Sequence, residues 1–350
     1  MFKAAYAPYT LNFLFEARTS RETMHCKPTY FIKVWAEDSP EVYGIGECAL
    51  FRGLSCDDTP DYEQRLLETC RNINSVDSES LRNMPSILFG VETAILDLKN
   101  GGKRIPFNTP WNNGETSISI NGLVWMGSVE LMRERIEQKL SEGFRCIKFK
   151  IGGEDFEQEF GLLKALRDRF SPEELEIRLD ANGAFTPQNA LERLNRLSQL
   201  TIHSLEQPIK AGQWSELKRI CAQSPIPIAL DEELIGVNAP ADKFRMLQEI
   251  KPQYIILKPA LCGSFSGASE WISMAQLLDI GWWATSALES NIGLNAIGEW
   301  VSTLGVTIPQ GLGTGGLYSN NIKSPLYCKG PHLFHDASNH WTVPNLDWKS

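Results

Sequence analysis

The chain has 350 residues, of which 42% are hydrophobic and 22% charged, and its formal net charge is −9. This composition is typical of a globular protein with a sizeable core, in one large domain or two smaller ones. The acidic balance argues against a nucleic-acid partner or an anionic membrane surface. We expect no secretion signal and no membrane span, because no basic start precedes an apolar stretch and every apolar run is short. The eight cysteines form no Cys-x-x-Cys pair, which favours reduced, buried thiols in a cytoplasmic protein.

The first third of the chain is predicted to contain strands and then helices. Short aromatic and β-branched segments separated by polar turns indicate the strands, and apolar residues at three- and four-residue spacing indicate the second helix. The predicted strands are 2–15, 29–35 and 42–48, the predicted helices are 61–74 and 87–98, and 106–114 is predicted to be a linker.

From residue 117 onward the pattern changes to strand followed by helix, repeated. The predicted strands are 117–124, 146–150, 175–180, 202–206, 226–231, 254–258, 282–286 and 306–310, with a helix between each pair. Eight such units in roughly 200 residues favour a parallel sheet closed into a barrel. An open doubly wound sheet is the alternative, but no Gly-x-Gly-x-x-Gly follows the first of these strands.

Charged residues recur at the C-terminal ends of five successive predicted strands, where barrels of this kind place their working residues. They are Lys148 and Lys150, Asp180, Glu206, Asp231 and Lys258, with 25 to 30 residues from one strand end to the next. Three carboxylates converging on one mouth would repel one another unless a cation neutralised them. Oxygen ligands without His or Cys select a hard ion, Mg²⁺ before Mn²⁺ or Ca²⁺.

Alternatives exist for the acids. Each carboxylate taken alone could cap the following helix. Glu232 could replace Asp231 as the ligand, although neighbours on a strand point to opposite faces, so that only one of them would face the mouth.

The three lysines suggest acid–base chemistry. Lys148 and Lys150 are two residues apart and share a strand face, opposite Lys258 across the proposed metal. Their mutual repulsion and the metal charge would lower the pKa of one of them and create a general base. A Schiff-base role for Lys258 is the alternative, but carbonyl–amine chemistry needs no metal.

Other polar groups could contact substrate at the same mouth. Arg178 shares the inward face with Asp180 and either orients a ligand, contacts an anionic substrate or fills the barrel as a buried ion pair. Ser286 and the glycine-rich run beginning at Gly311 offer backbone donors to an anion.

These motifs together resemble the enolase superfamily, muconate-lactonizing subgroup. The matching segments are Lys148-Phe149-Lys150, Asp180-Ala181-Asn182-Gly183, Glu206-Gln207-Pro208, Asp231-Glu232, Lys258-Pro259, Gly44–Glu47 and Phe89–Ala94. The resemblance implies a (β/α)7β barrel at 116–321 and an α+β capping domain at 1–115, completed by the C-terminal tail 322–350.

The resemblance also implies roles for the charged residues. Asp180, Glu206 and Asp231 match the Mg²⁺ ligands. Lys150 matches the base that removes a proton next to a carboxylate, Lys148 its neighbour and Lys258 the lysine on the opposite face. The cap loops near residues 47–57 would close over a small-molecule carboxylate substrate.

Within the subgroup, residues 286–294 and 311–314 look most like the o-succinylbenzoate synthases. By this resemblance the reaction is a syn dehydration of 2-succinyl-6-hydroxy-2,4-cyclohexadiene-1-carboxylate in menaquinone biosynthesis. Dipeptide epimerases and N-succinylamino acid racemases are the alternatives within the superfamily. Residues 311–316 lack the Asp-x-Asp pair that is typical of the epimerases, and 282–289 lack the His base of the mandelate-racemase type. A non-catalytic binding barrel is a remote alternative, and the sequence does not determine whether the chain is a monomer or a homo-oligomer.

Overall fold

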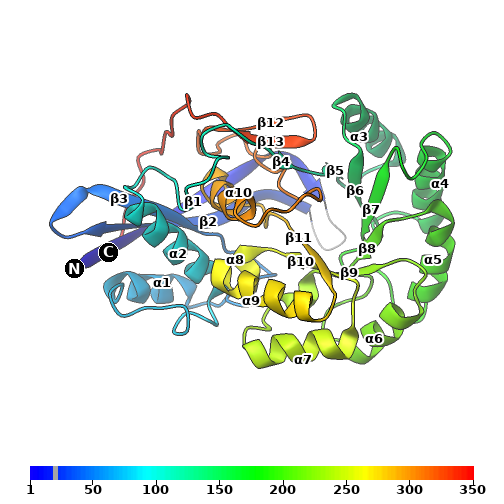
Figure 1. Ribbon diagram of the computed structural model, residues 1–350, viewed down its shortest axis with the longest axis horizontal. Coiled ribbons are helices and arrows are strands. Elements are labelled where there is room, and N and C mark those ends of the chain that lie inside the picture. The colour runs from blue at the N-terminus through cyan, green and yellow to red at the C-terminus, as the bar shows by residue number, and fades with distance from the viewer. Residues whose placement is uncertain (19–22) are drawn as a thin grey trace.

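The computed structural model describes residues 1–18 and 23–350 and contains a small antiparallel sheet beside a barrel (Figure 1). The antiparallel sheet has the order β1-β2-β3. Helices α1 and α2 pack on it through apolar side chains such as Leu66 and Ile87, against Ile32 of the sheet. The elements are β1 (Phe2–Arg18), β2 (Thr23–Ala36), β3 (Ser39–Cys48), α1 (Tyr62–Arg71) and α2 (Pro85–Lys99). All five predicted elements of this region are therefore confirmed.

Glycines in β3 let α2 lie directly on the strand. A Cβ atom at Gly44 would lie 1.9 Å from the carbonyl oxygen of Ala94, and one at Gly46 equally close to that of Gly90. Side chains at these two positions would push the helix away from the sheet. Gly44 and Gly46 thus fix the position of the strand that ends at Cys48.

The barrel sheet is parallel, and its strands lie side by side in chain order. Its strands are β5 (Gly122–Val124), β6 (Cys146–Lys150), β7 (Glu176–Asp180), β8 (Ser204–Glu206), β9 (Ile228–Leu230), β10 (Tyr254–Leu257) and β11 (Gly281–Ala284). The helices outside it are α3 (Val129–Ser141), α4 (Phe156–Arg167), α5 (Ala190–Leu197), α6 (Trp214–Gln223), α7 (Pro240–Ile250), α8 (Pro259–Cys262), α9 (Ser264–Leu277) and α10 (Asn291–Ser302), and two short 3₁₀ turns cover Ser198–Leu200 and Glu232–Leu234. The expected α/β barrel is confirmed.

Two predicted strands at the seam of the barrel differ from expectation. The segment 306–310 closes the barrel only through isolated parallel bridges, Gln310 to Ile120 and Gly311 to Thr285. Pro309 has no N–H for a ladder, which prevents a regular strand there. The predicted strand 117–124 is divided into β4 (Ile118–Ser119), which pairs with a C-terminal hairpin, and β5, which pairs with β6.

The C-terminal residues contact both parts of the molecule. The hairpin β12 (Leu326–Lys329) and β13 (His332–His335) joins β4. Beyond it, Trp341 and Trp348 pack with Phe31 and Ile45 of the antiparallel sheet. The expected linker at 106–114 is not loose, because Trp111 is completely buried and donates its indole N–H to the carbonyl of Leu333 at 3.1 Å. The division of domains at residues 115 and 321 stays a prediction.

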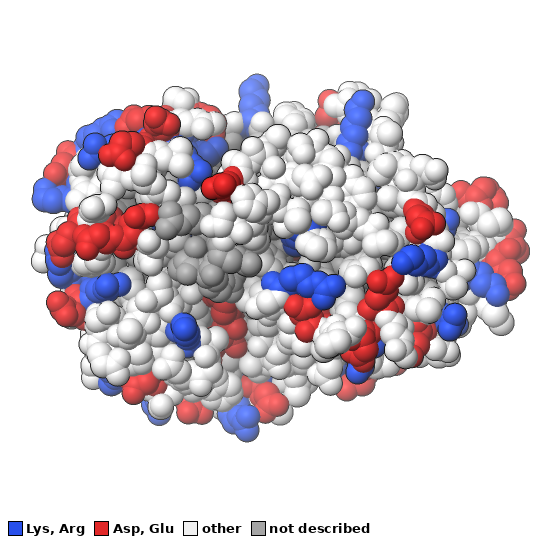
Figure 2. Space-filling model, turned by 180° about the vertical axis from the view of Figure 1, so that it is seen from behind, with Lys and Arg blue, Asp and Glu red and all other residues white. Residues whose placement is uncertain are grey.

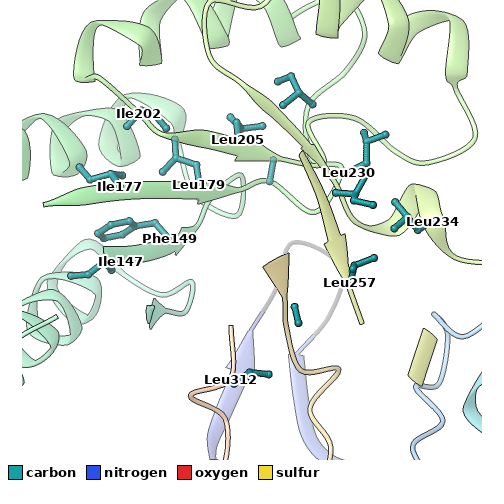
Figure 3. Packing of buried hydrophobic residues seen from close by; sticks show 14 of the residues in the cluster. Ile147, Phe149, Ile177, Leu179, Ile202, Leu205, Leu230, Leu234, Leu257 and Leu312 are labelled. Atoms are coloured by element: carbon teal, nitrogen blue, oxygen red, sulfur yellow. The ribbon is translucent and has the colours of Figure 1, made fainter. Parts of the chain in front are cut away.

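Apolar side chains surround the barrel strands, as Figure 3 shows for Ile147, Phe149, Ile177 and Leu179. They alternate along each strand with the residues that point inward, so one strand supplies both core and site. On the face drawn in Figure 2, acidic and basic side chains are interspersed, and basic ones do not gather into a stripe. No helix among the described residues combines the length and apolar character needed to cross a membrane. All eight cysteines are unpaired, and Cys26, Cys56 and Cys328 are exposed, so the expectation that the thiols are buried holds for only five of them.

Candidate active site

The sheet order determines which residues face one another across the barrel. Seven strands and the closing segment 306–311 make eight positions, so elements four positions apart are opposite. Lys150 at the end of β6 is therefore opposite Lys258, which follows β10. The three strands between these two lysines carry the acids: β7 ends at Asp180, β8 ends at Glu206, and Asp231 follows β9. The structure brings together the six residues that the sequence predicted.

The ammonium of Lys148 lies among the carboxylates. Its Nζ donates to both oxygens of Glu206, at 2.7 and 2.6 Å, and lies 2.9 Å from Oδ2 of Asp180. Both acids are only 1% exposed. An unpaired charge in a buried position is energetically costly. The ammonium of Lys148 offsets this cost for the negative charge of the two carboxylates.

The pKa shifts follow from burial and from this pairing. Burial opposes the charge on Lys148, but Asp180, Glu206 and Asp231 outweigh it and raise the pKa of Lys148. Burial likewise opposes ionisation of Asp180, yet Lys148 and Lys150 hold its pKa well below the ordinary value. Burial and the neighbouring acids raise the pKa of Glu206. The lowering of one lysine pKa that we expect depends on the charge of a bound metal and stays a prediction.

The two lysines proposed for proton chemistry are also paired. Lys150 Nζ donates to Asp180 Oδ2 at 2.9 Å and to Asn182 Oδ1 at 2.8 Å, and lies 5.9 Å from the ring centroid of Trp125. Lys258 donates to Oδ2 of Asp231. Burial opposes the charge of Lys258, but Asp231, Glu232 and Glu206 raise its pKa. These contacts aim both lysines at the space above the acids.

Glu232 differs from expectation. The strand ends at Leu230 and a 3₁₀ turn begins at Glu232, so the alternation of a strand no longer applies there. Oε1 of Glu232 accepts from Nδ2 of Asn182 at 3.0 Å, which places Glu232 at the mouth beside Lys150 rather than on the opposite face. Glu232 and Asn182 therefore connect the ends of two strands.

A cavity above these residues has one charged and one apolar side. Phe51 and Leu54 of the loop 49–58 contribute to its wall, as expected for a cap loop over the substrate. The lining residues are Met24, Phe51, Leu54, Asn121, Leu123, Trp125, Lys148, Lys150, Asp180, Asn182, Lys258, Leu261, Thr285, Ser286, Ala287, Leu288, Gly311, Gly313 and Thr314. Asp180 is the only acid among these described residues.

Ser286 and Gly311 line the cavity, but their backbone N–H groups are engaged elsewhere. The N–H of Gly311 donates to the carbonyl of Ala284 at 2.8 Å, and that of Ser286 donates to the carbonyl of Gly311 at 3.1 Å. Both N–H groups form the backbone hydrogen bonds that join the closing segment to the end of β11. The expectation that they donate to a substrate anion is therefore wrong for these two N–H groups.

Arg178 forms a buried ion pair inside the barrel, which is one of the three alternatives given for it above. It is 1% exposed, pairs with Glu176 at 2.7 Å and donates to the carbonyl of Pro309 at 2.8 Å. Its guanidinium also lies 4.4 Å from the ring centroid of Trp283. Arg178 does not line the cavity, because its long side chain points toward the opposite end of the barrel.

The acids fit a hard divalent cation by their chemistry. Asp180, Glu206 and Asp231 offer only oxygen donors. Burial and then the negative charge of Asp180 and Asp231 raise the pKa of Glu206, and a divalent ion would relieve that crowding of charge. Among the described residues, no three acids, histidines or cysteines are already grouped for an ion. Lys148 Nζ lies among the acids, 2.9 Å from Oδ2 of Asp180 and 2.6 Å from Oε2 of Glu206. The ligand assignment stays a prediction.

The sequence did not single out Asn182 as a site residue, although it orients Lys150. Its signal was its place two residues after a charged strand end, before a glycine, where a left-handed backbone is common; its φ is 42°. Gln207 was also missed: its side-chain oxygen accepts from the backbone N–H groups of Asp231 and Glu233, both at 3.2 Å, and thereby fixes the turn that carries Asp231.

This fold and this arrangement of charged strand ends agree with a family assignment. The Enolase C-terminal domain-like family model matches residues 131–316. The chain therefore belongs to the enolase superfamily. It is 44% identical to the o-succinylbenzoate synthase of Desulfotalea psychrophila, over 93% of this chain and 97% of that one.

Solved structures agree with this assignment. The crystal structure of MenC from Desulfotalea psychrophila matches with a TM-score of 0.85 and 40% identity, over 95% of this chain and 99% of that chain. The L-Ala-D/L-Glu epimerase of Bacillus subtilis is 27% identical over 51% of this chain and 49% of its own. Its substrate-liganded structure has a TM-score of 0.80 at 18% identity, over 95% of both chains, which shows a shared fold alone.

Proposed function

We propose that this protein is a Mg²⁺-dependent o-succinylbenzoate synthase of the cytoplasm, acting in menaquinone biosynthesis. It would remove water from 2-succinyl-6-hydroxy-2,4-cyclohexadiene-1-carboxylate and release 2-succinylbenzoate. The observation that carries the proposal is the placement of Lys150 and Lys258 on opposite walls of the barrel, with three carboxylates on the strands between them. The identity to the Desulfotalea psychrophila enzyme supports the same reaction.

The lysines perform the proton chemistry in this proposal. Lys150 removes the proton next to the substrate carboxylate and returns it to the hydroxyl that leaves from the same face. The ring becomes aromatic as the C–O bond breaks, and the hydroxyl departs as water. Lys258 stays protonated on the other face, where its charge stabilises the negative charge that develops. Mg²⁺ held by Asp180, Glu206 and Asp231 would act as a Lewis acid toward the carboxylate.

The rest of the cavity suits a carbocyclic acid. Leu123, Trp125, Leu261 and Leu288 provide apolar contacts for a ring. The wall opposite the acids carries no carboxylate among the described lining residues, so nothing there would hold the ammonium of a dipeptide. This feature favours dehydration over epimerisation of dipeptides.

The test compares both reactions in one preparation. The purified protein with Mg²⁺ should form an aromatic product from the cyclohexadiene acid, followed by ultraviolet absorbance. A panel of dipeptides in D₂O should show little α-proton exchange by NMR. Rapid dipeptide exchange without aromatic product would refute the synthase proposal and leave the superfamily assignment unchanged.

A further inference from the structure

Lys258 and Leu261 belong to a short connection between two larger elements. Lys258 follows β10, and the single helical turn α8 leads from it to Gly263 and Ser264, where α9 begins. Both Lys258 and Leu261 line the cavity. A helix of one turn is not stable by itself, because ordering its residues costs more than its few hydrogen bonds contribute. The position of α8 therefore depends on what holds its two ends.

The first end of α8 is held by the backbone of Lys258. The N–H groups of Leu261 and Cys262 donate to the carbonyl of Lys258, at 2.8 and 3.0 Å. A displacement of this turn would therefore move the backbone of Lys258. It would also move the side chain whose ammonium pairs with Asp231.

The second end of α8 has a strained backbone. Gly263 has a φ of 104° and Ser264 a φ of 63°. Glycine adopts such angles freely, but a serine keeps this conformation only where its surroundings enforce it. Ser264 is completely buried, so its hydroxyl needs a hydrogen-bond partner within the protein.

Glu92 of α2 provides this partner from the cap. Its Oε2 accepts from the hydroxyl of Ser264 at 2.6 Å, and its Oε1 accepts from the hydroxyl of Ser266, also at 2.6 Å. Phe89, one turn earlier on α2, packs with Phe265, and their ring centroids are 5.2 Å apart. Hydrogen bonds to a carboxylate are stronger than those between neutral groups. Glu92 therefore fixes the strained end of α8 to the cap.

We propose that Glu92 is a positioning residue that holds α8 through Ser264 and thereby places Lys258 and Leu261 against the substrate. This inference rests on the proposed function for its substrate. Because the charge of Lys258 acts on the transition state, a small displacement of this lysine lowers kcat more than it weakens binding. Glu92 touches neither the substrate nor the reacting atoms.

The first test compares two variants of Glu92. Glu92→Ala should lower kcat for the cyclohexadiene acid about tenfold, with a change of less than about threefold in KM. Hydrogen exchange of peptides covering 259–264 should become faster. Glu92→Gln should retain most of the wild-type kcat, because its amide oxygen can accept from Ser264. Its amide N–H can donate to the hydroxyl oxygen of Ser266, whose own proton can be donated to the carbonyl of Gly263, 3.3 Å away.

Two serine variants separate positioning from general damage. Ser264→Ala and Ser266→Ala each remove one hydroxyl that donates to Glu92 at 2.6 Å, but only residue 264 has the strained backbone at the end of α8. Ser264→Ala should therefore lower kcat and speed the exchange of 259–264. Ser266→Ala is the matched control, which should lower the melting temperature and keep the wild-type kcat. This pair also decides the case in which Glu92→Ala does not fold.

Three results would overturn the inference. They are unchanged kcat or unchanged exchange of 259–264 in Ser264→Ala, equal losses of kcat in the two serine variants, and a Glu92→Gln variant as slow as Glu92→Ala. Faster exchange in the Ser264→Ala variant of a protein that never converts the cyclohexadiene acid would overturn the proposed function alone.

Discussion

Lys150 is the residue on which the proposed proton transfer depends. Its Nζ is held by Asp180 and Asn182 at 2.9 and 2.8 Å, so its position does not depend on the substrate. We expect Lys150→Ala to lose about 10²–10⁴-fold in kcat, the usual contribution of a positioned base. Steady-state kinetics with the cyclohexadiene acid, with circular dichroism as a control for folding, would measure it. Near-normal turnover would remove Lys150 from the mechanism.

Lys258 should behave differently because its proposed role requires charge alone. Lys258→Arg keeps the cation but not a base that titrates near neutral pH. We expect this variant to retain measurable dehydration, reduced mainly by the bulk of the guanidinium, whereas Lys258→Ala loses the charge and most of the rate. Equal rates in the Arg and Ala variants would contradict a purely electrostatic role.

Asp180 connects the lysines to the proposed metal. Removing one carboxylate from three weakens a hard-ion site, so Asp180→Asn should bind Mg²⁺ at least about tenfold more weakly and lose turnover. Titration calorimetry would measure the affinity, and an unchanged melting temperature would show that the fold is intact. Wild-type Mg²⁺ affinity in this variant would show that Asp180 is not a ligand.

For single residues, the sequence predicted which side chains point into the barrel, because side chains alternate between the two faces of a strand and this alternation depends on the strand alone. It did not predict how far each one reaches. Arg178 shares its face with Asp180 yet contacts Glu176 and Pro309, away from the mouth. The place of Lys148 among the acids and the engaged N–H of Gly311 depend on neighbours remote in sequence.

At the scale of elements, the loop 49–58 joins the cap to the cavity through Phe51 and Leu54. Asp57 anchors it to the start of α2, accepting from the N–H and the hydroxyl of Ser86 at 2.9 and 2.6 Å. Burial raises the pKa of Asp57 from 3.8 to about 6, against the effect of these hydrogen bonds. The loop is therefore held by a carboxyl group that titrates in a mildly acidic range.

The sign of the resulting pH dependence follows from the raised pKa. The folded state binds the Asp57 proton more tightly than the unfolded state does. The contribution of Asp57 to the free energy of unfolding is therefore complete below pH 4 and is lost as pH rises through 6. The free energy of unfolding of the wild type, relative to Asp57→Asn, should fall by about 2–3 kcal/mol between pH 4 and 7. Urea titrations at several pH values would measure it. Asp58→Asn is the control, because Asp58 is partly exposed and pairs with Arg52; a flat difference for Asp57→Asn would contradict the assignment.

Elements with a local signal were predicted well, and those defined by their partners were not. The apolar faces of the helices and the short strands at β6 to β11 appear in the sequence as periodicity. The predicted strand 117–124 is divided at Ile120 because β4 pairs with β13, which lies more than two hundred residues later in the chain. The closing segment is irregular because Pro309 has no N–H to donate. Residue 311 must be a glycine because a Cβ there would lie 2.1 Å from the hydroxyl oxygen of Thr285.

For the whole molecule, the relation of tail, cap and barrel depends on packing that no single segment encodes. The two chain ends lie close together in Figure 1, where the N–H of Lys349 donates to the carbonyl of Tyr6 at 2.7 Å. Alternate residues of the tail, Trp341 and Val343 and then Leu346 and Trp348, are half-buried against the cap. Lys33 of β2 lies 4.8 Å from the ring centroid of Trp348. The tail thus covers the sheet face that carries Phe31 and Ile45.

Deleting residues 340–350 should therefore destabilise the cap before the barrel. Four half-buried apolar side chains at about 1 kcal/mol each suggest a loss of about 4 kcal/mol in the free energy of unfolding. Because the proposed ligands lie in the barrel, Mg²⁺ affinity should change little, whereas KM should rise as the cap strand that carries Met24, a residue of the cavity wall, loosens. Chemical denaturation, calorimetry and kinetics on the truncated chain would separate these effects. Tyr327→Ala is the control, because Tyr327 is exposed on the hairpin and its loss should leave all three quantities nearly unchanged. A truncated chain that loses Mg²⁺ binding together with the cap would show instead that the two parts unfold as one cooperative unit.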